Sequence, residues 1–267
     1  MSAFTGERLD PELARGTEIL ELHLARYRFA ADSVGAGRVL DIACGTGYGT
    51  NLLAEVADLA IGADISIVAV EHANRAYAST KCGFVQADVL RLGFADGAFD
   101  AVVSLETVEH VEDSTRYFAE VARVLGDQGI LVISAPNREV HSPGRDTPIH
   151  RWHCFEPTLD EFQSLLVSNG FAVQTLLGQI STLGSGAQLQ QTRKGRLLPA
   201  VVSLGQHVLP RVPDVAQRAL LRMLPVVPGV GRLLPSYRRA SPGDIVFVKS
   251  EVSRATNFLA VCTKLSQ

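Results

Sequence analysis

The sequence predicts an α/β fold in which a doubly wound, largely parallel sheet carries helices on both faces. Short apolar runs alternate with stretches of helical spacing along residues 38–177, which is the pattern of successive strand–helix–strand units. Glycines or acids follow several of these runs, at the strand ends where such sheets bind ligands. The chain has 267 residues, so it forms one large domain or one domain with an insertion.

The expected elements follow one another in a regular order. Strands are expected over residues 38–44, 59–63, 84–87, 99–105, 129–134 and 171–177. Helices are expected over residues 51–57, 66–78, 114–125 and 158–169. Ser66 supplies a capping oxygen to the free amides of the second helix. Thr158 and Glu161 have the spacing of a capping box, and Gly170 ends that helix.

Composition excludes several classes of protein. No apolar stretch reaches about 18 residues, so no transmembrane helix is expected. Acidic residues at positions 7, 10 and 12 stand where a signal peptide would need an apolar core. We therefore expect a soluble, cytoplasmic protein. The four cysteines form no CxxC pair and are expected to be small buried thiols without chemistry, namely Cys44, Cys82, Cys154 and Cys262.

A glycine-rich turn follows the first strand, and acids end the next two. Gly45 and Gly47 let the chain turn sharply and bring backbone amides against a ligand. Neither a complete dinucleotide fingerprint nor a Walker loop is present. Asp64 ends the second strand, where a carboxylate accepts hydrogen bonds from ribose hydroxyls. Asp88 ends the third strand and is placed to accept from an adenine amino group.

With these residues the sequence resembles the class I S-adenosylmethionine-dependent methyltransferases. The resemblance covers about residues 38–177 and implies a Rossmann-like, seven-stranded sheet of order 3-2-1-4-5-7-6, with residues 258–264 as its antiparallel last strand. It implies S-adenosylmethionine as the cofactor. The cofactor-binding residues that it implies are Asp41, Ala43, Gly45, Gly47, Asp64, Ile65, Asp88, Val89 and Glu106. Ala43 departs from the glycine that many members carry.

The segment Glu106-Thr-Val-Glu109-His110 follows the fourth strand. One helical turn would bring the two carboxylates and the imidazole to one side, where they suit a divalent cation or a general base; a solvated acidic helix start is the alternative. The segment is similar to the motif of ubiquinone-pathway O-methyltransferases and small-RNA 2′-O-methyltransferases. That resemblance implies Mg²⁺ or another divalent cation on Glu106, Glu109, His110 and a later histidine, His153 or else His150. Without a metal, His110 and His153 are the candidate catalytic bases.

A long loop after the fifth strand predicts an acceptor-binding region. Its histidines, arginines and Trp152 suit a polyhydroxylated molecule; a lid whose histidines cap neighbouring backbone is the alternative. The segments FTGER, LHLARY (residues 22–27) and SPGRDTP together resemble a bacterial methyltransferase subgroup associated with polysaccharides, glycolipids and glycosylated metabolites. This implies methylation of a sugar hydroxyl. The alternatives are an N- or O-methyltransferase of a secondary metabolite, an RNA 2′-O-methyltransferase, and a binding module without turnover.

Residues 185–240 carry nine basic residues and one acidic residue, Asp214. Such a shift in composition predicts an insertion. We expect a helical lid over residues 1–37, the cofactor-binding core over 38–184, a basic helical substrate cap over 185–243, and the last strands over 244–267. The basic segment would cap the active site, bind an anionic lipid-linked or nucleotide-linked sugar, contact a membrane surface or support a homo-oligomer. No RNA-binding signature accompanies it.

Overall fold

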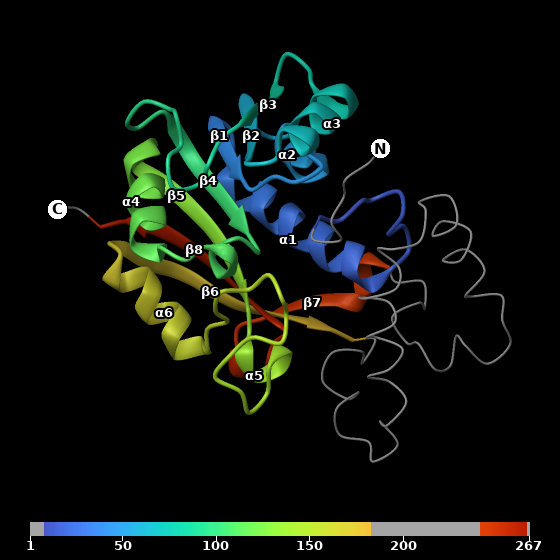
Figure 1. Cartoon of the computed structure of the whole chain (residues 1–267), viewed down its shortest axis with the longest axis vertical. Helices are drawn as coiled ribbons and strands as arrows, with labels where there is room; N and C mark the ends of the chain where they lie inside the picture. Colours follow the sequence, from blue (N-terminus) through green and yellow to red (C-terminus); the bar gives the residue numbers. More distant parts are fainter. Residues whose placement is uncertain (1–7, 183–240, 266–267) are drawn as a thin grey trace, which may run out of the picture. The chain divides into compact units, whose positions relative to one another are not determined.

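Eight strands form one mixed sheet in the computed structural model, which describes residues 8–182 and 241–265. The strands are β1 (Arg38–Ile42), β2 (Leu59–Asp64), β3 (Cys82–Gln86), β4 (Phe99–Leu105), β5 (Leu125–Pro136), β6 (Phe171–Ser181), β7 (Ile245–Val248) and β8 (Asn257–Lys264). Their order is β3-β2-β1-β4-β5-β8-β6-β7 (Figure 1). The first five pair in parallel, and β8 runs antiparallel between β5 and β6. The predicted order of seven strands is thus confirmed, and β7, which lies within the residues expected to form the last strands, adds an eighth strand at the edge.

Helices cover both faces of the sheet. Buried side chains that follow one another along a strand pack against helices on opposite faces. The helices are α1 (Glu18–Val34), α2 (Tyr48–Leu53), α3 (Ile67–Tyr77), α4 (Ser114–Val124), α5 (Arg138–His141) and α6 (Leu159–Ser168). On β5, Leu131 packs into a core with Phe118 of α4 and Phe162 of α6. The next residue, Val132, packs into a second core with Tyr27 of α1. Successive strand residues point to opposite faces, so the sheet is doubly wound as expected.

Local signals place the helix starts where the sequence predicts them. The hydroxyl of Ser66 accepts from the amide of Ala69 at 3.3 Å. At α6, the Thr158 hydroxyl accepts from the Glu161 amide, and the Glu161 carboxylate accepts from the Thr158 amide at 2.8 Å. These bonds satisfy amides that have no partner within the helix. Both predicted caps are confirmed.

Contacts divide the chain into two units, residues 1–22 with 181–246 and residues 23–180 with 247–267. Every contact of the candidate site described below lies within the second unit. The predicted basic insertion lies outside the described residues except for 241–243. Among the described helices, none has the length and apolar character needed to cross a membrane. Three of the free cysteines are buried as expected, whereas Cys154 is exposed, so the expectation of four buried thiols is wrong there.

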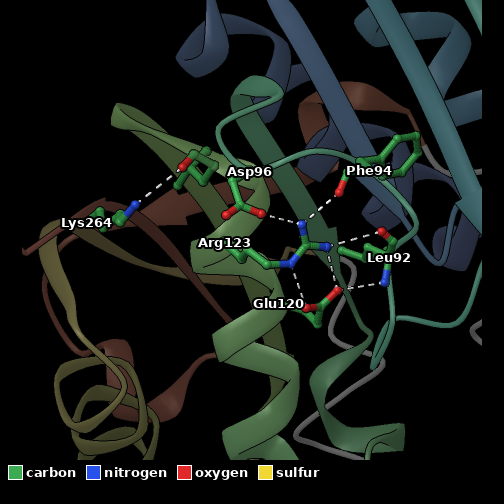
Figure 2. A network of polar contacts seen from close by, with 7 residues as sticks. Leu92, Phe94, Asp96, Glu120, Arg123 and Lys264 are labelled. Carbon is green, nitrogen blue, oxygen red and sulfur yellow. Dashed lines mark hydrogen bonds and ion pairs between the residues drawn. The ribbon is translucent and has the colours of Figure 1, made fainter.

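Arg123 on α4 anchors the connection between β3 and β4, residues 87–98. Its guanidinium donates to Glu120 and Asp96, each at 2.8 Å. It also donates to the carbonyls of Phe94 and Leu92 (Figure 2). Because all five N–H groups of a guanidinium are used, this residue fixes the path of the connection as well as its distance from α4.

We expect Arg123→Met to lower the free energy of unfolding by about 2 kcal/mol, because charge-assisted bonds are lost while the aliphatic stem is kept. The measurement is urea unfolding followed by circular dichroism. Arg75→Met is the control, since the Arg75–Glu71 pair is exposed and such pairs contribute about 0.5 kcal/mol. Equal effects of the two substitutions would show that the Arg123 network does not stabilise the fold.

Candidate active site

The candidate site lies at the carboxyl edge of the parallel strands. Asn257, the first residue of β8, pairs with Pro136, the last residue of β5. The antiparallel strand therefore begins at the edge where the parallel strands end. Side chains from β1, β2, β4, β5 and β8 consequently meet there, although they are far apart in the sequence.

The glycine turn after β1 needs its glycines for conformation and for space. Gly45 and Gly47 have φ angles of 58° and 86°, in a region that L residues avoid. A Cβ on Gly47 would also lie 2.6 Å from the Cβ of Ala73. Ala43 adopts a φ of 57°, so the alanine found here in place of glycine sits in a strained conformation.

Asp64 and its neighbours form a surface suited to a nucleoside. The Asp64 carboxylate is 3% exposed and accepts from the amides of Gly45 and Ser66 at 2.9 and 2.8 Å. These bonds hold it between the glycine turn and the start of α3. Ile65 is 62% exposed directly after it, which leaves an apolar contact surface for a base. The carboxylate of the exposed Asp88 accepts from the Leu90 amide and so faces its own turn, beside the partly buried Val89.

Asp41 is buried and joins two helices to β1. Its carboxylate accepts from the Thr50 hydroxyl of α2 at 2.6 Å and from the Tyr27 hydroxyl of α1 at 3.3 Å. Burial raises the pKa of Asp41 to about 7, although both hydrogen bonds oppose the rise. The structure therefore gives this predicted cofactor-binding residue a role inside the protein, and its contact with a ligand stays a prediction.

The spacing predicts one helical turn that holds Glu106, Glu109 and His110. In the structure, Glu106 lies outside that turn. Its φ is 53°, and the short 3₁₀ turn η1 (Val108–His110) begins only after it. The Glu106 carboxylate accepts from the hydroxyl of Ser134 at 2.7 Å and from the amide of Asn257 at 2.6 Å. Since these two bonds turn the carboxylate toward β5 and β8, Glu106 lies outside the cluster of possible metal ligands in the described residues, and its role as a ligand stays a prediction.

Three of the predicted metal-ligand residues do come together: Glu109, His110 and His153. Their ligand atoms lie within 4.8 Å of one another. The link is the amide of Cys154, which donates to the Glu109 carbonyl at 2.7 Å and so brings the long loop against η1. Glu109 is 0% exposed, and neither of its carboxylate oxygens has a hydrogen-bond partner among the described residues. Burial and the charge of Glu106 raise the pKa of Glu109 well above its usual value.

Both imidazoles of this cluster are oriented through Nδ1. His110 Nδ1 lies 3.0 Å from the Trp152 carbonyl, which only accepts, so Nδ1 carries the proton. His153 Nδ1 lies 2.7 Å from the Glu156 carboxylate. In each neutral ring this leaves Nε2 as the atom that accepts a proton or binds a metal. Burial and the two neighbouring histidines lower the pKa of His153 to about 4, so the ring is neutral at pH 7.

Sequence reasoning missed the residues that support His153. The Ser142 hydroxyl donates to Glu156 at 2.6 Å, and Glu156 is 2% exposed. The three-residue spacing of His153 and Glu156 was the available signal for this pair. His150 is exposed, with its ring 4.1 Å from that of His153. Among the described residues the ligand cluster contains His153 and neither His150 nor His141.

Comparisons with known proteins show the family to which the chain belongs. A family described as a methyltransferase domain matches residues 40–133. A probable S-adenosylmethionine-dependent methyltransferase of Mycolicibacterium smegmatis is 34% identical over 74% of this chain and 76% of its own length. The chain belongs to the S-adenosylmethionine-dependent methyltransferases. The O-methyltransferase cnsE of Penicillium expansum is 32% identical, over 75% of each chain.

Other relatives of this methyltransferase extend beyond the matched region. A Mycobacterium tuberculosis protein of the same description is 38% identical over 65% of this chain, and the match covers 63% of that protein. Among solved structures, a Mesorhizobium loti S-adenosylmethionine-dependent methyltransferase has a TM-score of 0.53 at 18% identity and is covered over its full length. The [4+2]-cyclase SpnF has a TM-score of 0.57 at 20% identity, covering 92% of this chain and 82% of its own. At these identities the likeness establishes the fold alone, and the chemistry has to be argued from the site.

The raised pKa of Asp41 predicts a pH-dependent stability. Because the carboxyl has a pKa of about 7 when folded and about 3.9 when unfolded, its neutral form stabilises the fold at low pH, and this contribution is lost as pH rises through 7. The free energy of unfolding of the wild type, relative to Asp41→Asn, should therefore fall by about 2–3 kcal/mol between pH 5 and 8. Urea unfolding without ligand measures it. Exposed Asp58→Asn is the control, and parallel curves for wild type and Asp41→Asn would contradict the prediction.

Proposed function

We propose that this methyltransferase transfers a methyl group from S-adenosylmethionine to a hydroxyl group of a sugar or a glycosylated molecule. The observation that carries the proposal is the cluster of Glu109, His110 and His153 at the end of β4. A hydroxyl acceptor has to lose a proton during transfer, and this cluster supplies groups that promote that loss. Relatives named as O-methyltransferases support oxygen as the acceptor atom.

The donor site follows from the strand ends. S-Adenosylmethionine, when bound, supplies a methyl group activated by a sulfonium. Asp64 is already held by two backbone amides and accepts from the ribose hydroxyls in this proposal. Ile65 and Val89 contact the base, and Asp88 accepts from its amino group. The turn at Gly45 and Gly47 lets the backbone approach the donor closely.

The cluster at Glu109 also fits a divalent cation. A buried carboxylate without a partner, beside two imidazoles with oriented rings, is the arrangement a cation completes. Glu109, His110 and His153 would hold the ion, which would lower the pKa of an acceptor hydroxyl. Two imidazole ligands favour Mn²⁺, Fe²⁺, Co²⁺ or Zn²⁺ over Mg²⁺, which prefers oxygen.

The long loop after β5 supports a sugar acceptor. Trp152 is 37% exposed, and its carbonyl orients His110. The guanidinium of Arg151 lies 4.4 Å from the centre of the Trp152 ring and stiffens that side chain. An aromatic surface with polar neighbours suits a sugar ring. The loop then brings the acceptor and the imidazoles together.

A simple base mechanism is the second candidate, since Nε2 of His153 or of His110 is placed to take the acceptor proton. The two mechanisms differ in their response to chelation. With a cation, dialysis against a chelator should abolish turnover and added Mn²⁺ should restore it, while the metal content of the purified protein falls in parallel. Glu109→Gln keeps the size but removes the anionic ligand, so it should lower activity at least about tenfold. Full activity after chelation together with an active Glu109→Gln would leave only the base mechanism.

Variants of the histidines test the cluster itself. His153→Ala should lower turnover by about 100-fold, because it removes a metal ligand or a base. His141→Ala is the control in the same connection between β5 and α6, at the end of α5 and outside the cluster, and should keep wild-type activity. Equal activity of His153→Ala and wild type would remove His153 from the mechanism.

The acceptor class is tested with a labelled methyl donor. A screen should include free sugars, lipid-linked and nucleotide-linked sugars, aminosugars, phenolic metabolites and RNA. We expect label on the oxygen of a sugar or glycosylated compound, located by mass spectrometry. Label on an amine, a phenol or RNA alone would overturn the proposed acceptor. Binding of the donor without transfer to any member would favour a binding module.

A further inference from the structure

Glu156 is a buried carboxylate in the connection between β5 and α6, and no lysine or arginine of the described residues forms an ion pair with it. Its side chain is 0% exposed. Arg138, which lines the same surface pocket as Glu156, pairs with Glu161 at 2.8 Å instead. Burying a carboxylate without a cationic partner is destabilising, and a glutamine or an apolar residue would fill the same space with less strain on the fold. The groups that the carboxylate binds therefore have to explain its presence.

The two oxygens of Glu156 bind one side chain each. Oε1 lies 2.7 Å from Nδ1 of His153, and Oε2 accepts from the hydroxyl of Ser142 at 2.6 Å. Both distances are short, as is usual for hydrogen bonds to an ionised acceptor. His153 is three residues away in the sequence and Ser142 is 14 residues away. The carboxylate thus joins the imidazole to a distant part of the same connection.

Ser142 is the first residue of the SPGRDTP segment and the one residue of that segment that is buried. Its amide donates to the carbonyl of Arg138 at 2.8 Å. Its hydroxyl oxygen accepts from the amide of Ile149, directly after the segment, at 2.9 Å. The same hydroxyl donates to Glu156. One buried hydroxyl therefore closes the segment on itself and connects it to the carboxylate.

His153 connects the carboxylate to the candidate cluster with Glu109 and His110. In a neutral imidazole, the hydrogen bond made by one nitrogen decides which nitrogen carries the proton. A carboxylate at Nδ1 accepts that proton's hydrogen bond, which leaves Nε2 without a proton. We propose that Glu156 is a positioning residue, through which Ser142 of the SPGRDTP segment holds His153 in its Nδ1–H form with Nε2 free to react. The inference rests on the proposed role of the cluster and is the same whether Nε2 takes the acceptor proton or binds a cation.

The form of the imidazole can be observed directly. The experiment is ¹⁵N NMR of the full-length protein labelled at histidine, at about pH 8, where an ordinary imidazole is neutral. A His153→Asn spectrum identifies the signals of His153. We expect the Nδ1–H form in the wild type and a mixture of both neutral forms in Glu156→Ala. Glu139→Ala removes an exposed carboxylate of the same connection and, as the control, should leave the His153 signals unchanged.

Turnover shows whether this form of the ring matters for the reaction. The assay uses S-adenosylmethionine and the acceptor identified in the screen described above. Glu156→Ala should lower kcat by about 10–100-fold, the usual effect of removing a group that orients a reacting histidine. The KM for the acceptor should change by less than about threefold, because a positioning residue does not contact the acceptor. Ser142→Ala should lower kcat by a smaller factor, and Glu139→Ala should keep wild-type kinetics.

Several results would overturn the inference. An Nε2–H form of His153 in the wild type is one, an unchanged Nδ1–H form in Glu156→Ala is another, and a normal kcat of that variant is a third. Should Glu156→Ala fail to fold, Glu156→Gln replaces it. A glutamine has one acceptor oxygen for Ser142 and His153 together, so kcat should fall only if the Nδ1–H form is lost, and either change without the other would also overturn the inference. A wild type that methylates no hydroxyl in the screen would reject the proposed function, whereas the spectra would still decide whether Glu156 holds His153.

Discussion

The buried carboxyl of Asp41 is the constraint on which the carboxyl edge of this sheet depends. It lies one residue before the end of β1 and is completely shielded from solvent. Thr50 reaches it from α2 and Tyr27 reaches it from α1. Through Thr50 it sets the helix that follows the glycine turn, and through Tyr27 it sets the helix that carries Arg26. An apolar residue here would leave two buried hydroxyls without an acceptor, which is destabilising.

The same edge contains two buried ionisable side chains that do not form an ion pair with each other. Glu109 and Arg26 are both buried, and each has polar atoms without partners among the described residues. An ion pair between them would leave neither group available to a ligand. Gln179 binds the guanidinium, and Glu109 lies in a 3₁₀ turn, where its backbone carbonyl accepts from the amide of Cys154. Stability is thereby given up at the place where binding is proposed, as is common at functional sites.

Sequence reasoning succeeded where the deciding interactions are local. The glycine turn, the cap at Ser66 and the capping box at Thr158 depend on residues within a few positions, and the structure contains all three. It failed for Glu106 because the bonds that orient this side chain come from residues 28 and 151 positions away. The pairing of Arg26 with Gln179 was missed for the same reason, since the two residues are 153 positions apart. A pattern of residue types along the chain carries no signal for such pairs.

Backbone strain marks the two strand ends that matter most. Ala43 after β1 and Glu106 after β4 both adopt positive φ angles, an unfavourable conformation for residues other than glycine. At Glu106 the compensation is visible, because Ser134 accepts from its amide while donating to its carboxylate, and Asn257 binds the other carboxylate oxygen. Those bonds stabilise the turn at Glu106, which ends β4 and allows η1 to begin at Val108. Without this turn, continued extension of β4 would carry Glu109 and His110 away from the loop that bears His153.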